Sequence, residues 1–222
     1  MSFVNVAQRP MRIAVLLAGI ALTWGTAAAA ETKKAYFAGG CFWCVEADFE
    51  SVRGVSEVIS GYTGGSTSNP TYKQVTRGGT GHFEAVEIIY NSNTVSYESL
   101  LTAFFRSVDP TDAGGQFCDR GESYRTAIFV SNAEERKAAE AAKARSQREL
   151  GKKLVTPILV AGAFYKAEAY HQNYYRSKEI VITRRGPKSK ANAYKFYRNA
   201  CKRDQRVIEL WGKKAPFAKK TS

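Results

Sequence analysis

Residues 35–46 read AYFAGGCFWCVE, a short apolar strand signal that passes through two glycines into the start of a helix. The glycines suit a tight turn, so the first cysteine, Cys41, is expected where the helix begins. Unpaired N–H groups and the positive end of the helix dipole at that point favour a thiolate. The neighbouring Phe42 and Trp43 suit the wall of an apolar pocket. The sequence therefore predicts a reactive sulfur beside a hydrophobic slot.

The first thirty residues have the pattern of a secretory signal peptide. Two arginines precede an apolar run at 13–22, and four alanines at 27–30 follow it. The run is short for a bilayer span, although an N-terminal membrane anchor is the alternative. Cleavage after the alanines would leave residues 31–222 in an oxidising compartment, and we expect the periplasm. No stable membrane insertion is expected after cleavage.

The mature chain is predicted to form one catalytic domain, residues 31–182, followed by a basic tail, residues 183–222. The net charge is +13, and from position 184 onward thirteen Lys or Arg residues stand against two acidic ones. Such a tail could bind nucleic acid, an anionic membrane face or an acidic partner. We favour a solvated, partly disordered extension, and an exported protein is not expected to bind nucleic acid.

Cysteine usage favours redox chemistry over a structural metal. The spacing lacks the paired clusters of a zinc site, and the two histidines, His82 and His171, are far apart in the sequence. We therefore expect no metal site. Four cysteines are also few for a disulfide scaffold of this size: Cys41, Cys44, Cys118 and Cys201.

Alternating strand and helix patterns continue along the chain. Ser96 is expected to cap an amphipathic helix, and a capping box at 131–134 opens a charged helix. Further strands are predicted at 55–62, 82–90, 125–130 and 157–161. This order predicts an α+β fold, a ferredoxin-like α/β sandwich with helices on one sheet face and an irregular C-terminal tail.

The strand at 82–90 places a carboxyl group on an apolar face. Its period of two puts Glu84 on the same face as Val86, Ile88 and Tyr90. Desolvation there would raise the carboxyl pKa and keep the proton near neutral pH. The alternative is a carboxylate at the exposed end of the strand.

Three tyrosines, Tyr62, Tyr72 and Tyr124, lie at or near predicted turns. Their hydroxyl groups could converge on one polar atom. The alternative for each is a half-buried tyrosine that satisfies a local hydrogen bond.

These residues, taken together, resemble the A-type peptide methionine sulfoxide reductases. The resemblance covers roughly residues 35–175, with the family's motifs in order and close to its spacing. No one motif is specific, but the ordered set is. In this sequence they read GCFW with Glu46, GYTGG at 61–65, NPTY at 69–72, GHFEAV at 81–86, DPT at 109–111, QFCDRG at 116–121, SYR at 123–125 and YHQ at 170–172.

The resemblance implies that Cys41 attacks the sulfur of methionine sulfoxide and becomes a sulfenic acid. It implies Glu84 as the acid that protonates the sulfoxide oxygen, with Tyr72 and Tyr124 as hydrogen-bond donors to that oxygen. Free and protein-bound methionine (S)-S-oxide are the implied substrates. The implied substrate-binding residues are Phe42 and Trp43 at the S-methyl group, and Asp119 and His171 near the substrate backbone.

Completion of the reaction needs a resolving thiol and then an external dithiol reductant such as a thioredoxin-like protein. Two candidates remain open: Cys44, where the family often has glycine, and Cys201 in the tail. Cys118 stands where asparagine is frequent and is expected as an inert thiol. Ala169 stands where many relatives carry an acid, which weakens the assignment of His171. No cofactor is implied, and we expect a monomer that repairs oxidised methionines in exported proteins.

Two other readings compete. The C-x-x-C unit and the segment Thr156-Pro157 are similar to those of a thioredoxin-like disulfide oxidoreductase, but the tryptophan lies inside the motif and the segment between is too long. A basic secreted binding module would explain the tail, but not the sulfur, the acid and the aromatics together.

Overall fold

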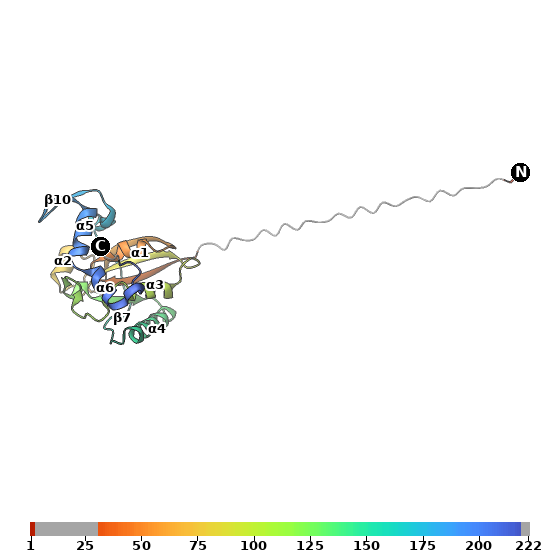
Figure 1. Ribbon diagram of the computed structural model, residues 1–222, viewed down its shortest axis with the longest axis horizontal. Coiled ribbons are helices and arrows are strands. Elements are labelled where there is room, and N and C mark those ends of the chain that lie inside the picture. Colours follow the sequence, from red (N-terminus) through yellow and green to blue (C-terminus); the bar gives the residue numbers. More distant parts are fainter. Residues whose placement is uncertain (3–30, 219–222) are drawn as a thin grey trace.

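The computed structural model describes residues 1–2 and 31–218, so residues 3–30 of the predicted signal peptide lie outside the described residues (Figure 1). No helix in the described part is long and apolar enough to cross a membrane. The α-helices are α1 (Phe42–Glu50), α2 (Tyr72–Arg77), α3 (Tyr97–Phe105), α4 (Ala133–Leu150), α5 (Lys190–Ala200) and α6 (Arg203–Trp211). The strands are β1 (Thr32–Gly39), β2 (Val55–Thr63), β3 (Phe83–Asn91), β4 (Gly115–Gln116), β5 (Asp119–Arg120), β6 (Thr126–Val130), β7 (Ile158–Val160), β8 (Tyr165–Lys166), β9 (Ile180–Thr183) and β10 (Gly186–Ser189).

The central sheet has the order β7-β6-β1-β3-β2-β8. Its four middle strands pair antiparallel, with α1 connecting β1 to β2 and α3 connecting β3 to β6. This is the ferredoxin-like β-α-β-β-α-β arrangement, and the predicted fold class is confirmed. At one edge β7 pairs parallel with β6 after the crossover helix α4, and at the other β8 pairs antiparallel with β2.

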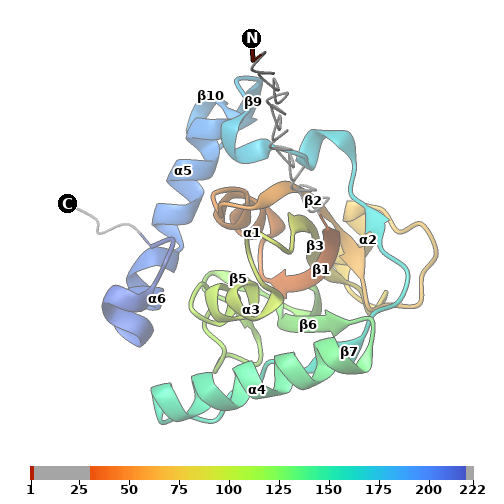
Figure 2. The same cartoon turned by 90° about the vertical axis from the view of Figure 1, so that its right-hand side faces the viewer.

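The main core lies between the sheet and helices α1, α3 and α4, with α4 beside α3 (Figure 2). Phe37 from β1 packs against Phe49 and Phe104, whose rings lie 5.6 and 4.9 Å away between centroids. All three side chains are fully buried. Replacing one such ring with alanine costs roughly 3–5 kcal/mol, so this aromatic cluster contributes strongly to stability.

Helices α1 and α3 begin where the sequence predicted, at a glycine turn and at a serine cap. Gly40 has φ +81°, and a Cβ there would lie 2.6 Å from Gln116 Cβ, so only glycine fits this turn. The chain therefore leaves β1 and begins α1 directly after Cys41. The Ser96 side chain accepts a hydrogen bond from the Ser99 N–H and caps α3.

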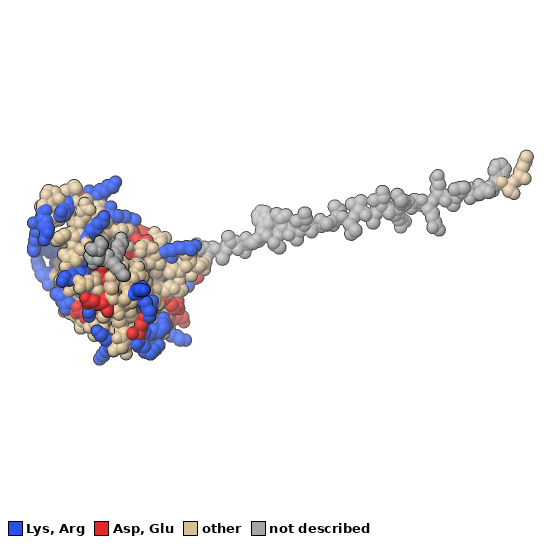
Figure 3. Space-filling view, in the orientation of Figure 1, with Lys and Arg blue, Asp and Glu red and all other residues tan. Residues whose placement is uncertain are grey.

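The C-terminal segment is more regular than the irregular tail that the sequence predicted. It forms the β9–β10 hairpin and helices α5 and α6, and α5 runs along one side of the molecule next to α1 (Figure 2). Tyr194, Val207 and Trp211 are buried against the domain, which gives both helices an apolar inner face. Many of its Lys and Arg side chains remain at the surface over β10 and α5 (Figure 3). The basic composition masked this packing because the apolar positions are few and widely spaced.

A disulfide joins Cys118 to Cys201 across 83 positions of sequence. Cys118 is therefore not the inert thiol that the sequence suggested. The bond fastens the end of α5 to the loop that carries β4 and β5. We expect the double variant Cys118→Ser/Cys201→Ser to lose roughly 2–4 kcal/mol of unfolding free energy, because the unfolded chain regains loop entropy. Urea denaturation under oxidising and reducing conditions measures this loss, and the reduced wild type should match the variant.

Candidate active site

The turn after β1 places two free thiols at the start of α1. Cys41 is the N-cap residue, and its carbonyl accepts a hydrogen bond of 3.0 Å from the Cys44 N–H. Both side chains are buried, with 6% of Cys41 and 2% of Cys44 exposed. They pack in a small cluster with Tyr174 and Tyr194, so the thiols lie beneath the C-terminal helix α5.

The predicted thiolate at Cys41 is wrong for this closed arrangement. Burial raises the pKa of the Cys41 thiol well above its ordinary value, and its hydrogen bond with Cys44 raises it further. The Cys41 sulfur accepts no capping hydrogen bond from the helix. The Phe42 N–H at the helix start instead donates to Glu84, at 3.0 Å. The free donor on which the prediction depended therefore serves the carboxyl group.

Glu84 lies in β3 opposite Tyr62 of β2, and it is 1% exposed. Burial raises its pKa to about 8, while the Phe42 N–H opposes the rise. Its Oε2 accepts the Phe42 N–H, and its Oε1 has no hydrogen-bond partner among the described residues. The structure thus selects the buried position over the exposed one. At neutral pH this group is a carboxylic acid with one oxygen available to a substrate.

Two of the three predicted tyrosines converge beside this acid. Tyr72, the first residue of α2, shares a side-chain hydrogen bond with Tyr124, and burial raises the pKa of both hydroxyls. The Tyr124 hydroxyl also interacts with Glu84 and lowers the pKa of that carboxyl. Tyr62 does not join them, because its hydroxyl donates to Glu168 at 2.8 Å.

An aromatic wall surrounds the start of α1. Phe42 is 1% exposed, and its ring centroid lies 6.2 Å from that of Tyr72. Trp43 is partly buried and stacks on Tyr174, with centroids 3.8 Å apart and planes 9° from parallel. The sequence reasoning missed Tyr174. Only its position three residues after His171, in a short aromatic-rich segment, could have signalled it.

His171 packs between these rings, with its centroid 5.0 Å from Phe42 and 4.3 Å from Tyr72. Its Nδ1 accepts a hydrogen bond of 3.2 Å from Trp43 Nε1, and this fixes the indole ring. Burial lowers the pKa of His171 to about 4, so the imidazole is neutral at pH 7. An acceptor Nδ1 requires the proton on Nε2, which has no partner among the described residues.

We expect the His171 ring to stay uncharged down to about pH 4. The unfolded ring binds a proton at its ordinary pKa of 6.5. The contribution of the neutral ring to the free energy of unfolding is therefore fully present above that pH and is lost as the pH drops toward 4. NMR titration of the two histidine rings measures the pKa directly. A midpoint near the ordinary value would contradict the buried, neutral ring.

Asp119 lies in β5 and faces the C-terminal helix. Its carboxylate accepts a hydrogen bond from the Tyr197 hydroxyl of α5, and burial raises its pKa. Tyr197 also meets Trp43 edge-on, with centroids 6.4 Å apart. The Cys118–Cys201 disulfide is adjacent in sequence to Asp119 and lies one helical turn after Tyr197. The C-terminal segment is therefore part of the site wall, which the sequence did not predict.

Two acidic residues support the site from behind. Glu168 accepts hydrogen bonds of 2.8 Å from both the Tyr62 hydroxyl and the Tyr72 N–H, although position 169 carries alanine. Glu46, fully buried in α1, accepts from Ser60 Oγ at 2.7 Å, and burial raises its pKa to about 7. These hydrogen bonds fix the positions of β2, α1 and α2 around Glu84.

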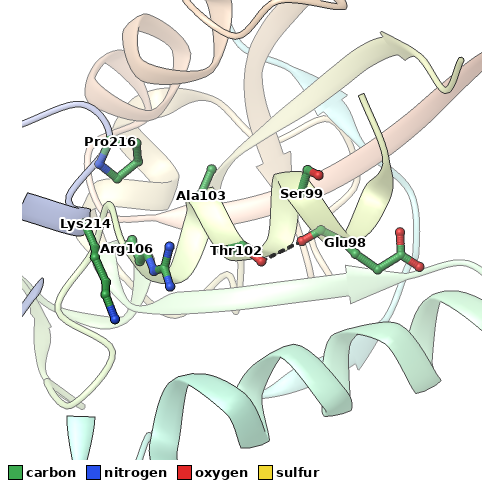
Figure 4. Close-up of a pocket in the computed structure, with 7 residues that line it drawn as sticks. All are labelled: Glu98, Ser99, Thr102, Ala103, Arg106, Lys214 and Pro216. Carbon is green, nitrogen blue, oxygen red and sulfur yellow. Dashed lines mark hydrogen bonds between the residues drawn. The ribbon is translucent and has the colours of Figure 1, made fainter. Parts of the chain in front are cut away.

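Two other features of the described residues carry no site. A hollow of about 340 Å³ beside α3 has no cysteine, histidine or buried acid in its lining (Figure 4). Cys118, Asp119 and Cys201 lie close together, but the two sulfurs are bonded to each other and offer no thiolate to a metal. The hollow beside α3 is lined by Glu98, Ser99, Thr102, Ala103, Arg106, Lys214 and Pro216.

The site combines a buried pair of free thiols with a protonated carboxyl group and two tyrosine hydroxyls, and aromatic rings surround them. This chemistry is that of a thiol-dependent oxidoreductase. Residues 33–213 match the family model described as peptide methionine sulfoxide reductase. The chain belongs to this family and is a peptide methionine sulfoxide reductase of the A type. The thioredoxin-like reading and the binding-module reading are therefore set aside.

Two relatives of known family have similar sequences. The chain is 46% identical over 189 residues to peptide methionine sulfoxide reductase MsrA 2 of Rhizobium meliloti, covering 85% of this chain and 88% of that protein. It is 46% identical over 182 residues to MsrA of Bacillus subtilis, covering 81% and 96%.

Solved structures show the same fold. The reduced form of Mxr1 from Saccharomyces cerevisiae aligns with a TM-score of 0.62 and 31% identity, over 66% of this chain and 85% of that one. Methionine sulfoxide reductase A of Corynebacterium diphtheriae aligns with a TM-score of 0.58 and 30% identity, over 64% and 73%.

Proposed function

We propose that the protein reduces methionine sulfoxide by attack of the Cys41 sulfur on the sulfoxide sulfur. The observation that supports this most is Glu84: a buried carboxyl group, protonated at neutral pH, hydrogen-bonded to the first N–H of the Cys41 helix. A sulfoxide oxygen is a poor leaving group until it gains a proton. Glu84 donates that proton, and Tyr72 and Tyr124 donate hydrogen bonds to the same oxygen as charge develops.

The aromatic wall selects the substrate. Phe42 and Trp43 hold the S-methyl group by shape and apolarity, with the indole fixed by His171. Asp119 and His171 lie beside the substrate backbone. The family acts on the S epimer at sulfur, and we assign the same preference here. The products of this step are methionine and a sulfenic acid on Cys41.

We infer that Cys44 resolves the sulfenic acid. Its thiol shares a hydrogen bond with Cys41, whereas Cys201 is already bonded to Cys118. The Cys44 sulfur bonds to the Cys41 sulfur, the S–O bond breaks, and water leaves. An external dithiol, such as a thioredoxin-like protein, then reduces the disulfide and is itself oxidised. The electrons come from thiols throughout, so no metal or organic cofactor is required.

We further propose that the enzyme acts as a monomer in the periplasm, where it repairs oxidised methionines in exported proteins. The support is the pattern of residues 1–30, in which arginines, an apolar run and alanines follow one another. Cell fractionation and N-terminal sequencing of the mature chain test this. A cytosolic protein that keeps its first thirty residues would contradict it.

A single-turnover experiment tests the mechanism. Fully reduced enzyme is mixed with one equivalent of N-acetylmethionine sulfoxide without reductant, quenched with N-ethylmaleimide and mapped by peptide mass spectrometry. We expect one methionine product per enzyme and a new Cys41–Cys44 disulfide. A Cys41–Cys201 disulfide as the first product would assign resolution to the tail, and product without any modification of Cys41 would overturn the mechanism.

A further inference from the structure

Helix α6 inserts a buried arginine beside the first turn of α1. Arg203 is 2% exposed although it carries a permanent charge. Its Nη1 donates to the Gly39 carbonyl at 3.2 Å, and its Nη2 donates to the Ser107 carbonyl at 2.9 Å. The same Nη2 lies 3.7 Å from Asp48 Oδ2. The guanidinium group therefore reaches from the residue two before Cys41 to the second turn of the helix.

A second arginine from the C-terminal segment lies on the same side. Arg198 of α5 binds Asp48 Oδ1 at 2.8 Å, and its Nη1 also donates to the Tyr194 hydroxyl at 3.1 Å. Its other donors bind Asp204. Tyr194 in turn packs in the buried cluster that contains Cys44. The two arginines thus approach α1 from α5 and α6 together.

This side of α1 is the one that carries Cys44. Asp48 follows Cys44 by four residues, which places both side chains on one face of the helix. The closer partner of Asp48 is Arg198, whereas Arg203 is 3.7 Å away. Arg203 Nε is also buried without a hydrogen-bond partner among the described residues. Part of the charge of Arg203 is therefore left uncompensated in an environment where charges interact strongly.

We propose that Arg203, with Arg198 beside it, is a positioning residue that holds Cys44 as a thiolate ready to attack the Cys41 sulfenic acid. This rests on the proposed role of Cys44 as the resolving thiol. A buried cation favours the anionic form of a neighbouring thiol and opposes the desolvation that favours the neutral one. The C-terminal helices then contribute directly to the second step of the reaction.

The electrostatics around Cys44 agree with the geometry. The Cys41 hydrogen bond, followed by the charges of Arg203 and Arg198, lowers the pKa of Cys44 to about 7 against the effect of burial. Several charged and titratable groups surround Cys44 among the described residues. They are Cys41 at the N-cap of α1, Asp48 on α1, Glu84 on β3, Tyr174 and Tyr175 in the segment before β9, Tyr194, Tyr197 and Arg198 on α5, and Arg203 on α6.

The step balances without another reagent. The Cys44 thiolate attacks the Cys41 sulfenic sulfur, an S–S bond forms and the S–O bond breaks. The oxygen leaves as hydroxide and takes up one proton, which equals the proton that Cys44 released when it became a thiolate. Cys44 is oxidised, the sulfenic sulfur is reduced, and water is the by-product.

The test separates methionine formation from disulfide formation in single turnovers of the full-length, reduced enzyme. We compare wild type with Arg203→Met and Arg203→Gln, which remove the charge, and with Arg203→Lys, which keeps it. Arg206→Met is the matched control, because Arg206 lies on the same helix but pairs with Asp109 and Glu209 near the surface. Dimedone traps the sulfenic acid, and peptide mapping identifies the disulfide.

We expect the methionine burst to be unchanged in all variants. In Arg203→Met and Arg203→Gln, Cys41–Cys44 bond formation at pH 7 should slow roughly three- to tenfold, because a smaller fraction of Cys44 is a thiolate. The slowing is limited because a thiolate of higher pKa is a stronger nucleophile. The midpoint of the pH profile for disulfide formation should move to higher pH in both variants, because the charge of Arg203 lowers the pKa of Cys44. Arg203→Lys should keep most of the wild-type rate of disulfide formation. Alkaline pH should restore that rate in Arg203→Met and Arg203→Gln.

Two results would overturn the proposal. One is an unshifted pH profile in folded Arg203→Met or Arg203→Gln. The other is a parallel fall of burst and disulfide formation that Arg203→Lys does not rescue, which would make Arg203 a structural pin only. If wild type itself gives no methionine burst or no Cys41–Cys44 bond, the proposed function fails instead. The wild-type reaction thus distinguishes the two failures.

Discussion

Cys41→Ser should abolish methionine sulfoxide reduction, lowering turnover by roughly 10⁴-fold or more. A serine hydroxyl is a far weaker nucleophile than a thiol, and its oxygen cannot accept the sulfoxide oxygen and return it as water. The substitution changes little else, because Cys41 makes no capping hydrogen bond that serine would lose. Consumption of N-acetylmethionine sulfoxide with dithiothreitol as reductant measures the effect.

Cys118→Ser serves as the control for this experiment. Its side chain is exposed and takes no part in the proposed first step, so one equivalent of methionine should still form at the wild-type rate. A Cys41→Ser protein that retains more than a trace of turnover would show that another group attacks the sulfoxide.

Glu84→Gln should slow the first chemical step by roughly 10²- to 10⁴-fold, the usual contribution of a positioned general acid. The amide keeps an oxygen that can accept the Phe42 N–H, so the start of α1 stays in place. It has no acidic proton to give to the sulfoxide oxygen. Rapid-quench measurement of methionine formation tests this, and alkylation of Cys41 by iodoacetamide should persist in the variant.

The rate of the first chemical step should depend on pH through the protonation of Glu84. Glu84 has a pKa raised to about 8 by burial, so it carries its proton below that pH and loses it above. The wild-type rate of methionine formation should therefore fall as the pH rises through about 8, and Glu84→Gln should lack this fall. His171 adds no inflection near neutrality, since its pKa is lowered to about 4. A wild-type rate that instead rises across this range would point to limitation by thiolate formation.

Local signals in the sequence were sufficient for most of the fold. The alternation around Glu84 predicted β3, the glycines before Cys41 predicted the turn into α1, and Ser96 predicted the cap of α3. Each of these depends on side-chain period, backbone freedom or a hydrogen bond within a few residues. Such features form wherever the sequence occurs, so they can be read from it directly.

The fold class and the family could thus be inferred from the sequence alone, and so could the choice of Cys41 and Glu84 as the candidate nucleophile and acid. The pairing of Cys118 with Cys201, the hydrogen bond from Tyr197 to Asp119 and the burial of Arg203 became visible only in the folded chain. It also reversed the expected ionisation at Cys41. Disulfide pairing, burial and pKa depend on groups that only the folded chain brings together: 83 positions separate the two bonded cysteines, and 78 separate Asp119 from Tyr197.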